Sequence, residues 1–378
     1  MEFTLTEEHK MIRDAARDFA QTELLSGVID RDENQTFPNE QIKKLGQLGF
    51  MGMMVDPKYG GAGMDTVSYV LAMEEISKVD ASTSVVMSVN NSLVCYLIEH
   101  FGNDFQKEKY LAKLTTGEKL GAFSLSEPQS GSDASNMNTT AIKKDDFYVL
   151  NGTKNWVTNG IHSDLVLVFA MTEKEVGHKG ISCFIVEKSF EGFECGKPEE
   201  KLGIRSSDTC ELYFDNVKVP KENLIGNEGE GFKIALATLD GGRIGIAAQA
   251  LGIAVASLNH SISYSKDRHQ FGKPIASNQG IQFKLADMAM EIESARLLIW
   301  KAAWAKDNHK DFGVLASMAK VYASEVAMKA STQCVQIHGG YGYIKETGVE
   351  RLMRDAKITQ IYEGTSEIQR VVIARSLL

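Results

Sequence analysis

The chain has 378 residues, of which 43% are hydrophobic and 24% charged, a balance that excludes disordered, collagen-like and coiled-coil chains. It carries 41 Lys and Arg against 50 Asp and Glu, a net charge of −9, so no bulk positive field attracts phosphates and nucleic acid is not expected as the main partner. The length predicts two or three domains.

Residues 1–118 are predicted to form an all-α domain. Thr6 precedes two glutamates, and a side-chain acceptor with early carboxylates suits the free N–H groups of a helix start. Apolar residues then recur at helical spacing from Ile12 to Leu24. Segment 56–61 interrupts the pattern as a loop, after which helical spacing resumes.

Residues 119–225 are predicted to form a small β-domain or barrel. Apolar runs at 165–169 and 181–186 indicate strands, and shorter runs follow at 211–214 and 217–219. The run 147–150 stands directly before Asn151-Gly152 and predicts one arm of a hairpin with its turn at that dipeptide.

Residues 226–378 are predicted to be helical again. An apolar stripe from Ile281 to Ala302 meets no glycine or proline before Asp311, which predicts a helix of about 40 Å. A second stripe follows over 315–326, and long helices with buried stripes indicate a four-helix bundle. The predicted fold class is therefore α+β multidomain: an N-terminal all-α domain, a middle β-barrel-like domain and a C-terminal four-helix bundle.

The sequence gives no sign of a membrane span, a targeting segment or a metal site. No stretch approaches about 18 uninterrupted apolar residues, and the acidic start is unlike a signal or transit peptide. We expect a bacterial cytoplasmic protein or, for a processed eukaryotic chain, one of the mitochondrial matrix.

Five scattered cysteines match no zinc pattern and are expected to be buried small hydrophobic residues in a reducing compartment; these are Cys95, Cys183, Cys195, Cys210 and Cys334.

The chain contains no P-loop, no HExxH and no GxGxxG between a strand and a helix, but polar segments with glycine remain. Segment 123–133 contains several hydroxyls that can face a planar ligand; alternatively it is a surface turn. Segment 151–160 contains a tryptophan and a nearby threonine hydroxyl that can support such a ligand; alternatively its tryptophan is a buried core residue. Segments 268–272 and 336–342 combine Arg268, which can pair with a phosphate, with glycines that let the backbone approach a ligand. Alternatively, both segments have only a structural role.

The last polar segment, 361–368, ends in a predicted helix start. Thr365 is expected to cap a final helix that ends near Leu377. Glu363 then lies just ahead of the helix N-terminus beside a glycine, where it is either a general base or an ordinary loop carboxylate.

Together these segments resemble the acyl-CoA dehydrogenase family, most closely its short-chain (butyryl-CoA) branch. The resemblance runs from Thr6 to the C-terminus and follows the family's helical, β and helical plan. It includes the stretches 201–205, 239–245, 281–287 and 362–370.

The resemblance implies FAD, bound without a Rossmann fold, and a homotetramer built as a dimer of dimers. Trp156 and Thr158 would flank the isoalloxazine, and Arg268 with Gln279 would reach the FAD of a neighbouring subunit. The implied FAD contacts are Phe123, Leu125, Ser126, Ser132, Trp156, Val157, Thr158, Arg268, Phe271, Gln279, Gln336, Ile337, His338, Gly339, Gly340, Thr365, Ser366 and Glu367.

The resemblance also implies the reaction. Glu363 would remove the α-proton of a short-chain acyl-CoA, the β-hydrogen would leave as hydride to flavin N5, and the product would be a trans-2-enoyl-CoA. Electron-transferring flavoprotein would accept the electrons. The implied substrate contacts are Ser132, Asp240, Arg243, Tyr362 and Gly364.

One position discriminates within the family. Isovaleryl- and long-chain-type relatives have their base immediately before the arginine that matches Arg243, where this chain has Gly242. A base at Glu363 is therefore expected. The alternatives are a medium- or branched-chain dehydrogenase, an acyl-CoA oxidase, a flavin hydroxylase of the same fold that should lack Glu363, a DNA-protective relative that would need a basic face, and a helical scaffold without catalysis.

Overall fold

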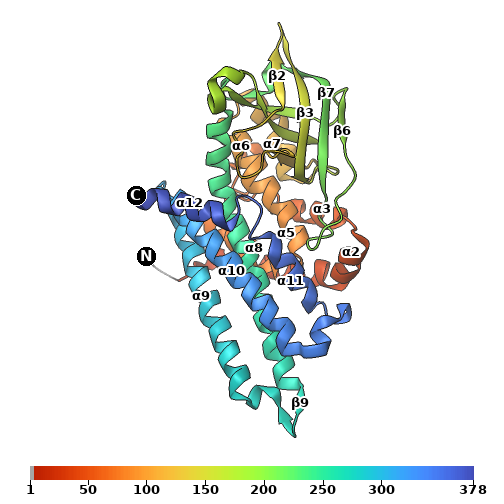
Figure 1. Cartoon of the computed structure of the whole chain (residues 1–378), viewed down its shortest axis with the longest axis vertical. Coiled ribbons are helices and arrows are strands. Elements are labelled where there is room, and N and C mark those ends of the chain that lie inside the picture. Colours follow the sequence, from red (N-terminus) through yellow and green to blue (C-terminus); the bar gives the residue numbers. More distant parts are fainter. Residues whose placement is uncertain (1–3) are drawn as a thin grey trace.

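The computed structural model describes residues 4–378. Strands gather at one end of an elongated molecule, long helices extend to the other end, and the N-terminal helices pack between them (Figure 1). Helices come first, strands second and helices last, which confirms the predicted fold class. The proposed boundaries at 118/119 and 225/226 fall in connections between elements.

The N-terminal helices begin where the sequence predicts. Thr6 accepts a hydrogen bond from the backbone N–H of His9, and the His9 side chain completes a capping box. The predicted loop near residue 58 holds one 3-10 turn, Pro57–Tyr59. The helices are α1 (Glu7–Phe19), α2 (Val28–Asn34), α3 (Asn39–Gln47), α4 (Thr66–Ser77), α5 (Ala81–Ser88), α6 (Tyr96–Phe101) and α7 (Asp104–Thr115), with a π-helical stretch η4 (Val89–Cys95) joining α5 to α6.

The strands form one eight-stranded sheet with its own core. The hydrogen-bonded order is β6-β7-β3-β2-β4-β5-β8, and β1 pairs with β4. Residues such as Tyr148, Val168 and Phe184 pack in this core, separately from the helical core. The strands are β1 (Gly121–Ser124), β2 (Thr140–Lys143), β3 (Phe147–Thr158), β4 (Leu165–Met171), β5 (Ile181–Glu187), β6 (Phe193–Cys195), β7 (Thr209–Pro220) and β8 (Leu224–Ile225).

The predicted hairpin arm at 147–150 is confirmed, because this part of β3 pairs antiparallel with β2, but the expected turn at Asn151-Gly152 is wrong. Both residues lie inside β3, at a register shift against β7, and the chain instead turns before Phe147, whose carbonyl accepts from the backbone N–H of Lys144. A Cβ at Gly152 would lie 2.5 Å from the Oγ1 of Thr139. This glycine therefore allows a close approach between segments rather than a turn.

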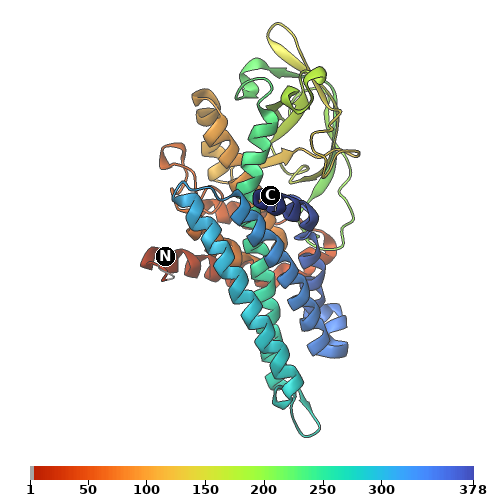
Figure 2. The ribbon, with the colours of Figure 1, turned by 60° about the vertical axis from the view of Figure 1, so that its left-hand side comes forward.

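The C-terminal part is a bundle of long helices. α8 runs from beside the sheet to the β9 end of the molecule, and α9 and α10 lie along the part of it that is remote from the sheet (Figures 1 and 2). α10 packs on α8, α9, α11 and α12, and the α9 predicted from the stripe is confirmed. The elements are α8 (Gly231–Asp267), a short hairpin of β9 (His269–Gln270) and β10 (Lys273–Pro274), α9 (Gln279–Asp307), α10 (Gly313–His338), α11 (Val349–Ile358) and α12 (Ser366–Leu377).

Two long apolar helices and four of the five cysteines are buried inside the protein. Ala81–Phe101 and Gly231–Asp267 are long and apolar enough to cross a membrane, but 94% and 89% of their apolar windows are buried inside the protein, as in core helices. Four cysteines are buried as expected, whereas Cys195 is only half-buried. The expectation of burial is wrong for Cys195 because it ends the short strand β6, with no further strand beyond it in the sheet order.

Candidate active site

Glu363 lies in the tight turn between α11 and α12. Thr365 caps α12 by accepting from the N–H of Ile368 at 3.3 Å, which confirms the predicted helix start. Glu363 and Gly364 have φ values of +52° and +94°, and a left-handed backbone at a residue other than glycine costs on the order of 1–3 kcal/mol. The strain indicates that the surrounding structure holds this turn in place.

Two side chains hold the turn. Nε2 of Gln369 donates to the carbonyls of Glu363 and Gly364 at 3.2 and 3.0 Å, and Nζ of the buried Lys320 donates to the Gly364 carbonyl at 2.7 Å. Lys320 lies on α10 and its pKa is lowered to about 8 by burial. Neither residue was assigned a role from the sequence.

The carboxyl group of Glu363 faces α8 across a glycine. A Cβ at Gly242 would lie only 2.2 Å from Oε2 of Glu363. Although Glu363 as a whole is half-buried, its Oε2 is sealed from solvent and has no hydrogen-bond partner among residues 4–378. Burial raises the pKa of Glu363 to about 7, against the opposing charges of Lys320 and Arg243. Such a carboxyl group is half ionised at neutral pH, as a general base requires.

Arg243, a predicted substrate contact, lies near the Glu363 carboxyl group and bonds to Asp240, a second predicted contact. Its Nη1 donates to Oδ1 of Asp240 at 2.5 Å and to Oγ of Ser317 on α10 at 3.4 Å. Burial raises the pKa of Asp240, and the Arg243 charge opposes that shift. α8 and α10 therefore place two cations, those of Arg243 and Lys320, beside one carboxyl group.

Beyond Glu363, a set of buried polar side chains closes the space between α4, α5 and α8. The hydroxyl of Tyr69 donates to Oγ of Ser88 at 3.0 Å, and Tyr362 donates to Gln249. A Cβ at Gly245, one helical turn after Gly242, would lie 2.5 Å from the Tyr69 hydroxyl. These contacts use the polar atoms of Tyr69 and Tyr362 within the protein.

In the middle domain, a buried ion pair fixes the segment predicted to line a flavin. Nζ of Lys154 on β3 donates to Oε1 of Glu127 at 2.8 Å and to the Leu125 carbonyl at 3.1 Å. Glu127 also accepts from the N–H of Thr139 at 3.0 Å. Burial alone would raise the pKa of Glu127, but Lys154 and these donors lower it to about 2. The pair ties residues 125–127 to the strand that carries Trp156.

Breaking this pair should destabilise the protein. Lys154→Met leaves a buried carboxylate unpaired, and we expect the free energy of unfolding to fall by about 3–5 kcal/mol. Lys143→Met is the matched control, because Lys143 pairs with Glu228 at the surface, where an ion pair contributes about 0–1 kcal/mol. Thermal and urea unfolding measure both. Equal effects of the two variants would contradict the assigned role.

The same pair predicts the pH dependence of stability. The pKa of Glu127 is about 2 in the folded protein, below its ordinary value of 4.5. Its contribution to stability is therefore fully present above pH 4.5 and is lost as the pH falls towards 2.

Trp156 is not a core residue. It is 62% exposed while Val157 is 1% exposed, and Thr158 is half-buried. Trp156 has a φ of +59° at a register shift between β3 and β7. Trp156 and Thr158 are therefore both available to a ligand, and the alternative of a buried core tryptophan is excluded.

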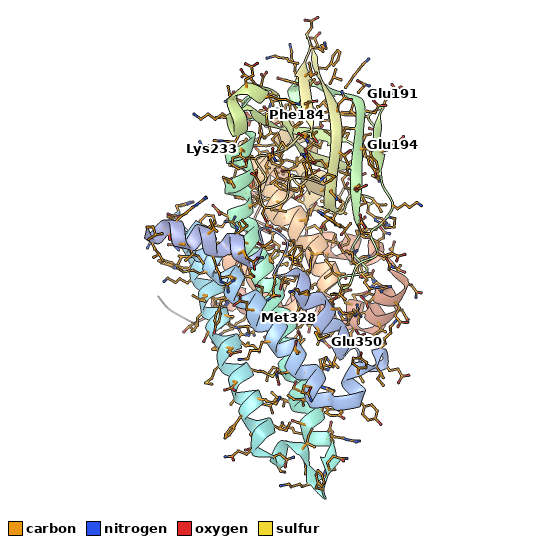
Figure 3. All side chains as sticks on the ribbon, viewed as in Figure 1. Phe184, Glu191, Glu194, Lys233, Met328 and Glu350 are labelled. Carbon is orange, nitrogen blue, oxygen red and sulfur yellow. The ribbon has the colours of Figure 1, made fainter. Side chains whose placement is uncertain are left out.

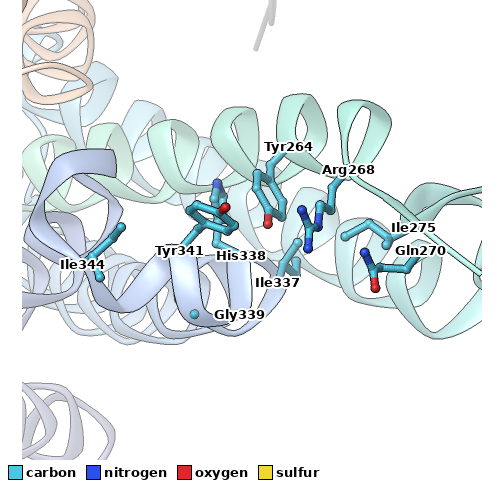
Figure 4. Close-up of a pocket in the computed structure, with 10 residues that line it drawn as sticks. Tyr264, Arg268, Gln270, Ile275, Ile337, His338, Gly339, Tyr341 and Ile344 are labelled. Carbon is cyan, nitrogen blue, oxygen red and sulfur yellow. The ribbon is translucent and has the colours of Figure 1, made fainter.

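A second group of predicted residues lines a cavity of about 500 Å³ where the end of α8 meets the end of α10 (Figure 4). The Arg268 guanidinium lies over the Tyr341 ring at 5.6 Å, and the His338 ring stacks on Tyr264. The lining residues are Tyr264, Arg268, Gln270, Ile275, Ile337, His338, Gly339, Gly340, Tyr341 and Ile344.

Some predicted residues lie outside this cavity. Phe271 is 99% exposed at the tip of the molecule, and Gln279 and Gln336 are exposed and do not line the cavity. Tyr341, which belongs to the predicted segment 336–342, does line it. Tyr264 also lines it and was missed, because a tyrosine inside the long apolar helix α8 has the pattern of a core residue. Among residues 4–378 no group of three or more His, Cys, Asp or Glu could hold a metal ion.

Family models match nearly the whole chain. The N-terminal domain of acyl-CoA dehydrogenase matches residues 6–118, the middle domain 122–217 and the C-terminal domain 229–378. The chain belongs to the acyl-CoA dehydrogenase family. As a member of the acyl-CoA dehydrogenases it is an oxidoreductase, which confirms the predicted enzyme class.

The similar acyl-CoA dehydrogenases are near full-length matches. The chain is 53% identical to an acyl-CoA dehydrogenase of Bacillus subtilis and 50% identical to a short-chain specific acyl-CoA dehydrogenase of Clostridium acetobutylicum, with 99% of each chain covered in both cases. The structure of butyryl-CoA dehydrogenase from Megasphaera elsdenii is 51% identical, with a TM-score of 0.98 and full coverage of both chains. A chain from a structure titled for the electron transferring flavoprotein of Acidaminococcus fermentans is also 51% identical, with a TM-score of 0.99 and full coverage of both chains.

Proposed function

We propose that this protein is an FAD-dependent dehydrogenase that converts a short-chain, butyryl-CoA-like thioester into its trans-2-enoyl-CoA and passes the electrons to an electron-transferring flavoprotein. The observation that carries the proposal is the carboxyl group of Glu363, which is buried against Gly242 with a pKa near 7. Relatives named short-chain specific support the substrate class, and a structure titled for the flavoprotein supports the electron acceptor.

In the proposed reaction Glu363 is the base. The thioester carbonyl acidifies the neighbouring α-C–H only weakly, so the proton acceptor must be close and its pKa must be near the working pH. Oε2 of Glu363, which has no partner among residues 4–378, would receive the α-proton. The Glu363 backbone N–H would hold the carbonyl oxygen, where each well-placed hydrogen bond typically contributes a few kcal/mol as enolate charge develops.

The buried polar side chains behind Glu363 support a short acyl chain. Tyr69 is hydrogen-bonded to Ser88, and Tyr362 is hydrogen-bonded to Gln249. An acyl chain long enough to reach these side chains would have to break their buried hydrogen bonds, and each polar group left unpaired costs about 1–3 kcal/mol. Medium- and branched-chain substrates and an oxidase reaction remain the alternatives.

The chain's own residues fit FAD. Arg268 and backbone at Gly339 and Gly340 line the cavity, and buried Oγ of Ser366 and Oε1 of Gln369, at the start of α12, lack partners among residues 4–378. Ser132, Trp156 and Thr158 would meet the flavin ring. Bound FAD would supply the acceptor for the β-hydrogen and its electron pair.

A cofactor shared between two subunits would account for the proposed homotetramer. The cavity around Arg268 lies near the β9 end of the molecule, whereas the turn before α12 lies near its middle (Figures 1 and 2). A second copy would bring its own Arg268 and Gln279 to the cofactor of the first. The proposed location is a bacterial cytoplasm or, for a processed eukaryotic chain, the mitochondrial matrix.

An anaerobic titration tests the function. The purified flavin-loaded protein is mixed with butyryl-, hexanoyl-, octanoyl- and isovaleryl-CoA, and visible absorbance is followed. Bleaching strongest with butyryl-CoA is expected. Stronger bleaching with a longer or branched chain would keep the reaction but change the substrate, and a yellow protein that none of them bleaches would refute the dehydrogenase proposal.

The pH dependence should follow Glu363. Because only the ionised carboxylate accepts a proton, kcat/KM for flavin reduction should rise as the pH increases through about 7 and then level off. Lys320→Met removes a charge that favours the ionised form, so the midpoint should move to higher pH, whereas Lys320→Arg should keep it near the original value. An unchanged midpoint in Lys320→Met would contradict this coupling.

Arg268 should retain the cofactor. In Arg268→Ala we expect weaker FAD binding and lower tetramer stability together, measured by flavin content after gel filtration and by mass photometry. Lys266→Ala removes the same charge from an exposed position two residues earlier and should leave both unchanged. Full FAD loading in Arg268→Ala would overturn the assigned contact.

A further inference from the structure

Two cysteines meet at the outer edge of the sheet. Cys195 ends the edge strand β6, and Cys210 is the second residue of the neighbouring strand β7, where Cys195 is paired with Leu212. In Figure 3, Glu194 of the same edge strand extends from the outer side of the sheet. Cys195 is half-buried and Cys210 is buried, so one thiol is reachable from solvent and the other lies beneath it.

Both sulfur atoms converge on Gly160. Sγ of Cys195 donates to the Gly160 carbonyl at 3.3 Å, and a Cβ at Gly160 would lie 2.6 Å from Sγ of Cys210. Because Cys195 is paired with Leu212 and Cys210 lies two residues away on the same strand, the two side chains are on the same face of the sheet. Because residue 160 is a glycine, no Cβ displaces the Cys210 sulfur from its position beside the Gly160 backbone.

The two thiols differ in acidity. Hydrogen bonding from Cys210 lowers the pKa of Cys195 to about 7, Lys188 adds to this, and burial and Asp208 oppose it. The same contact raises the pKa of Cys210. A thiolate at neutral pH, partly exposed and next to a second thiol, is the environment in which cysteines react with oxidants.

The other three cysteines provide an internal comparison. Cys95, Cys183 and Cys334 are buried, and burial raises the pKa of each, to about 11 for Cys334. They should be inert under conditions in which Cys195 reacts.

We propose that Cys195 and Cys210 form a redox-active dithiol in which a peroxide oxidises Cys195 and Cys210 then closes an intramolecular disulfide. The Cys195 sulfur attacks one oxygen of hydrogen peroxide, the O–O bond breaks, hydroxide leaves and a sulfenic acid forms. The Cys210 sulfur then attacks the Cys195 sulfur, the S–O bond breaks, and water leaves with the Cys210 proton. In sum, two thiols lose two electrons and two protons, and the peroxide becomes two waters.

Mass mapping tests the site. The reduced flavin-loaded protein is treated with hydrogen peroxide, free thiols are blocked with N-ethylmaleimide, and non-reduced peptides are analysed. We expect a Cys195–Cys210 cross-link before any change at the other three cysteines. Cys334→Ser, which also removes one thiol, should still form the cross-link.

Single replacements separate the two roles. In Cys210→Ser, dimedone should trap a sulfenic acid at Cys195; in Cys195→Ser, Cys210 should stay reduced and unlabelled. The proposal is overturned if Cys195 is alkylated no faster than Cys334, or if peroxide leaves Cys195 and Cys210 uncross-linked. Because the readout is thiol chemistry, it is independent of the proposed dehydrogenase activity.

Discussion

Flavin reduction by butyryl-CoA should fall by about 10²- to 10⁴-fold in Glu363→Gln, the range that a positioned general base contributes. Glutamine has the size of glutamate, so it still fits against Gly242, where the space admits no additional atom. FAD content and acyl-CoA binding should therefore remain. Anaerobic stopped-flow absorbance measures the reduction rate, and equilibrium titration of the flavin spectrum measures binding.

The matched control is Glu108→Gln. Glu108 lies exposed on α7, so the same chemical change there should leave the reduction rate unchanged. If Glu363→Gln turned over like the parent protein, another group would be the base. If it lost acyl-CoA binding as well as turnover, the result would indicate a misfolded turn before α12 and would not support the role of base.

Gly242→Ala should produce the second large loss. The added Cβ would lie 2.2 Å from Oε2 of Glu363 and 2.8 Å from a methyl group of Leu93, so the carboxyl group has to move. A misplacement of about 1 Å can cost about 10²-fold in rate, and we expect at least that fall in flavin reduction.

The neighbouring residue supplies the control for Gly242→Ala. A Cβ at Gly241 would meet only the flexible end of Lys306, at 3.6 Å. Gly241→Ala makes the same change in the same helix and should keep the reduction rate within about twofold of the parent. Equal losses in both variants would point to damage of α8 itself, and no loss in Gly242→Ala would show that Glu363 does not react from this position.

The fold was largely readable from local patterns. Helix starts at Thr6 and Thr365, the stripe of α9 and the runs of β4 and β5 depend on neighbours in the sequence. The turn predicted at Asn151-Gly152 was wrong because the conformation of this dipeptide depends on Thr139 and β7. A contact between distant segments leaves no local signature.

The candidate site was only partly readable. Glu363 was found through its place before a helix start, and Arg268 with the glycines at 339–340 through composition. Lys320, Gln249 and Tyr69 were missed because each lies among other buried helix residues, and its role depends on which helix packs opposite. Cys195 was assigned to the core because the sequence alone does not say which strand lies at the edge.

The long helix α8 has a consequence for how the chain acquires its structure. It packs on α4, α5, β5 and α10, and Gln249 at its centre bonds to Ala81, 168 positions earlier. Because N-terminal and C-terminal helices share one core cluster, the first 118 residues cannot complete their packing until α8 and α10 have been synthesised. Such large sequence separations predict slow folding through intermediates with exposed apolar faces, while the sheet, with its own core, can close earlier.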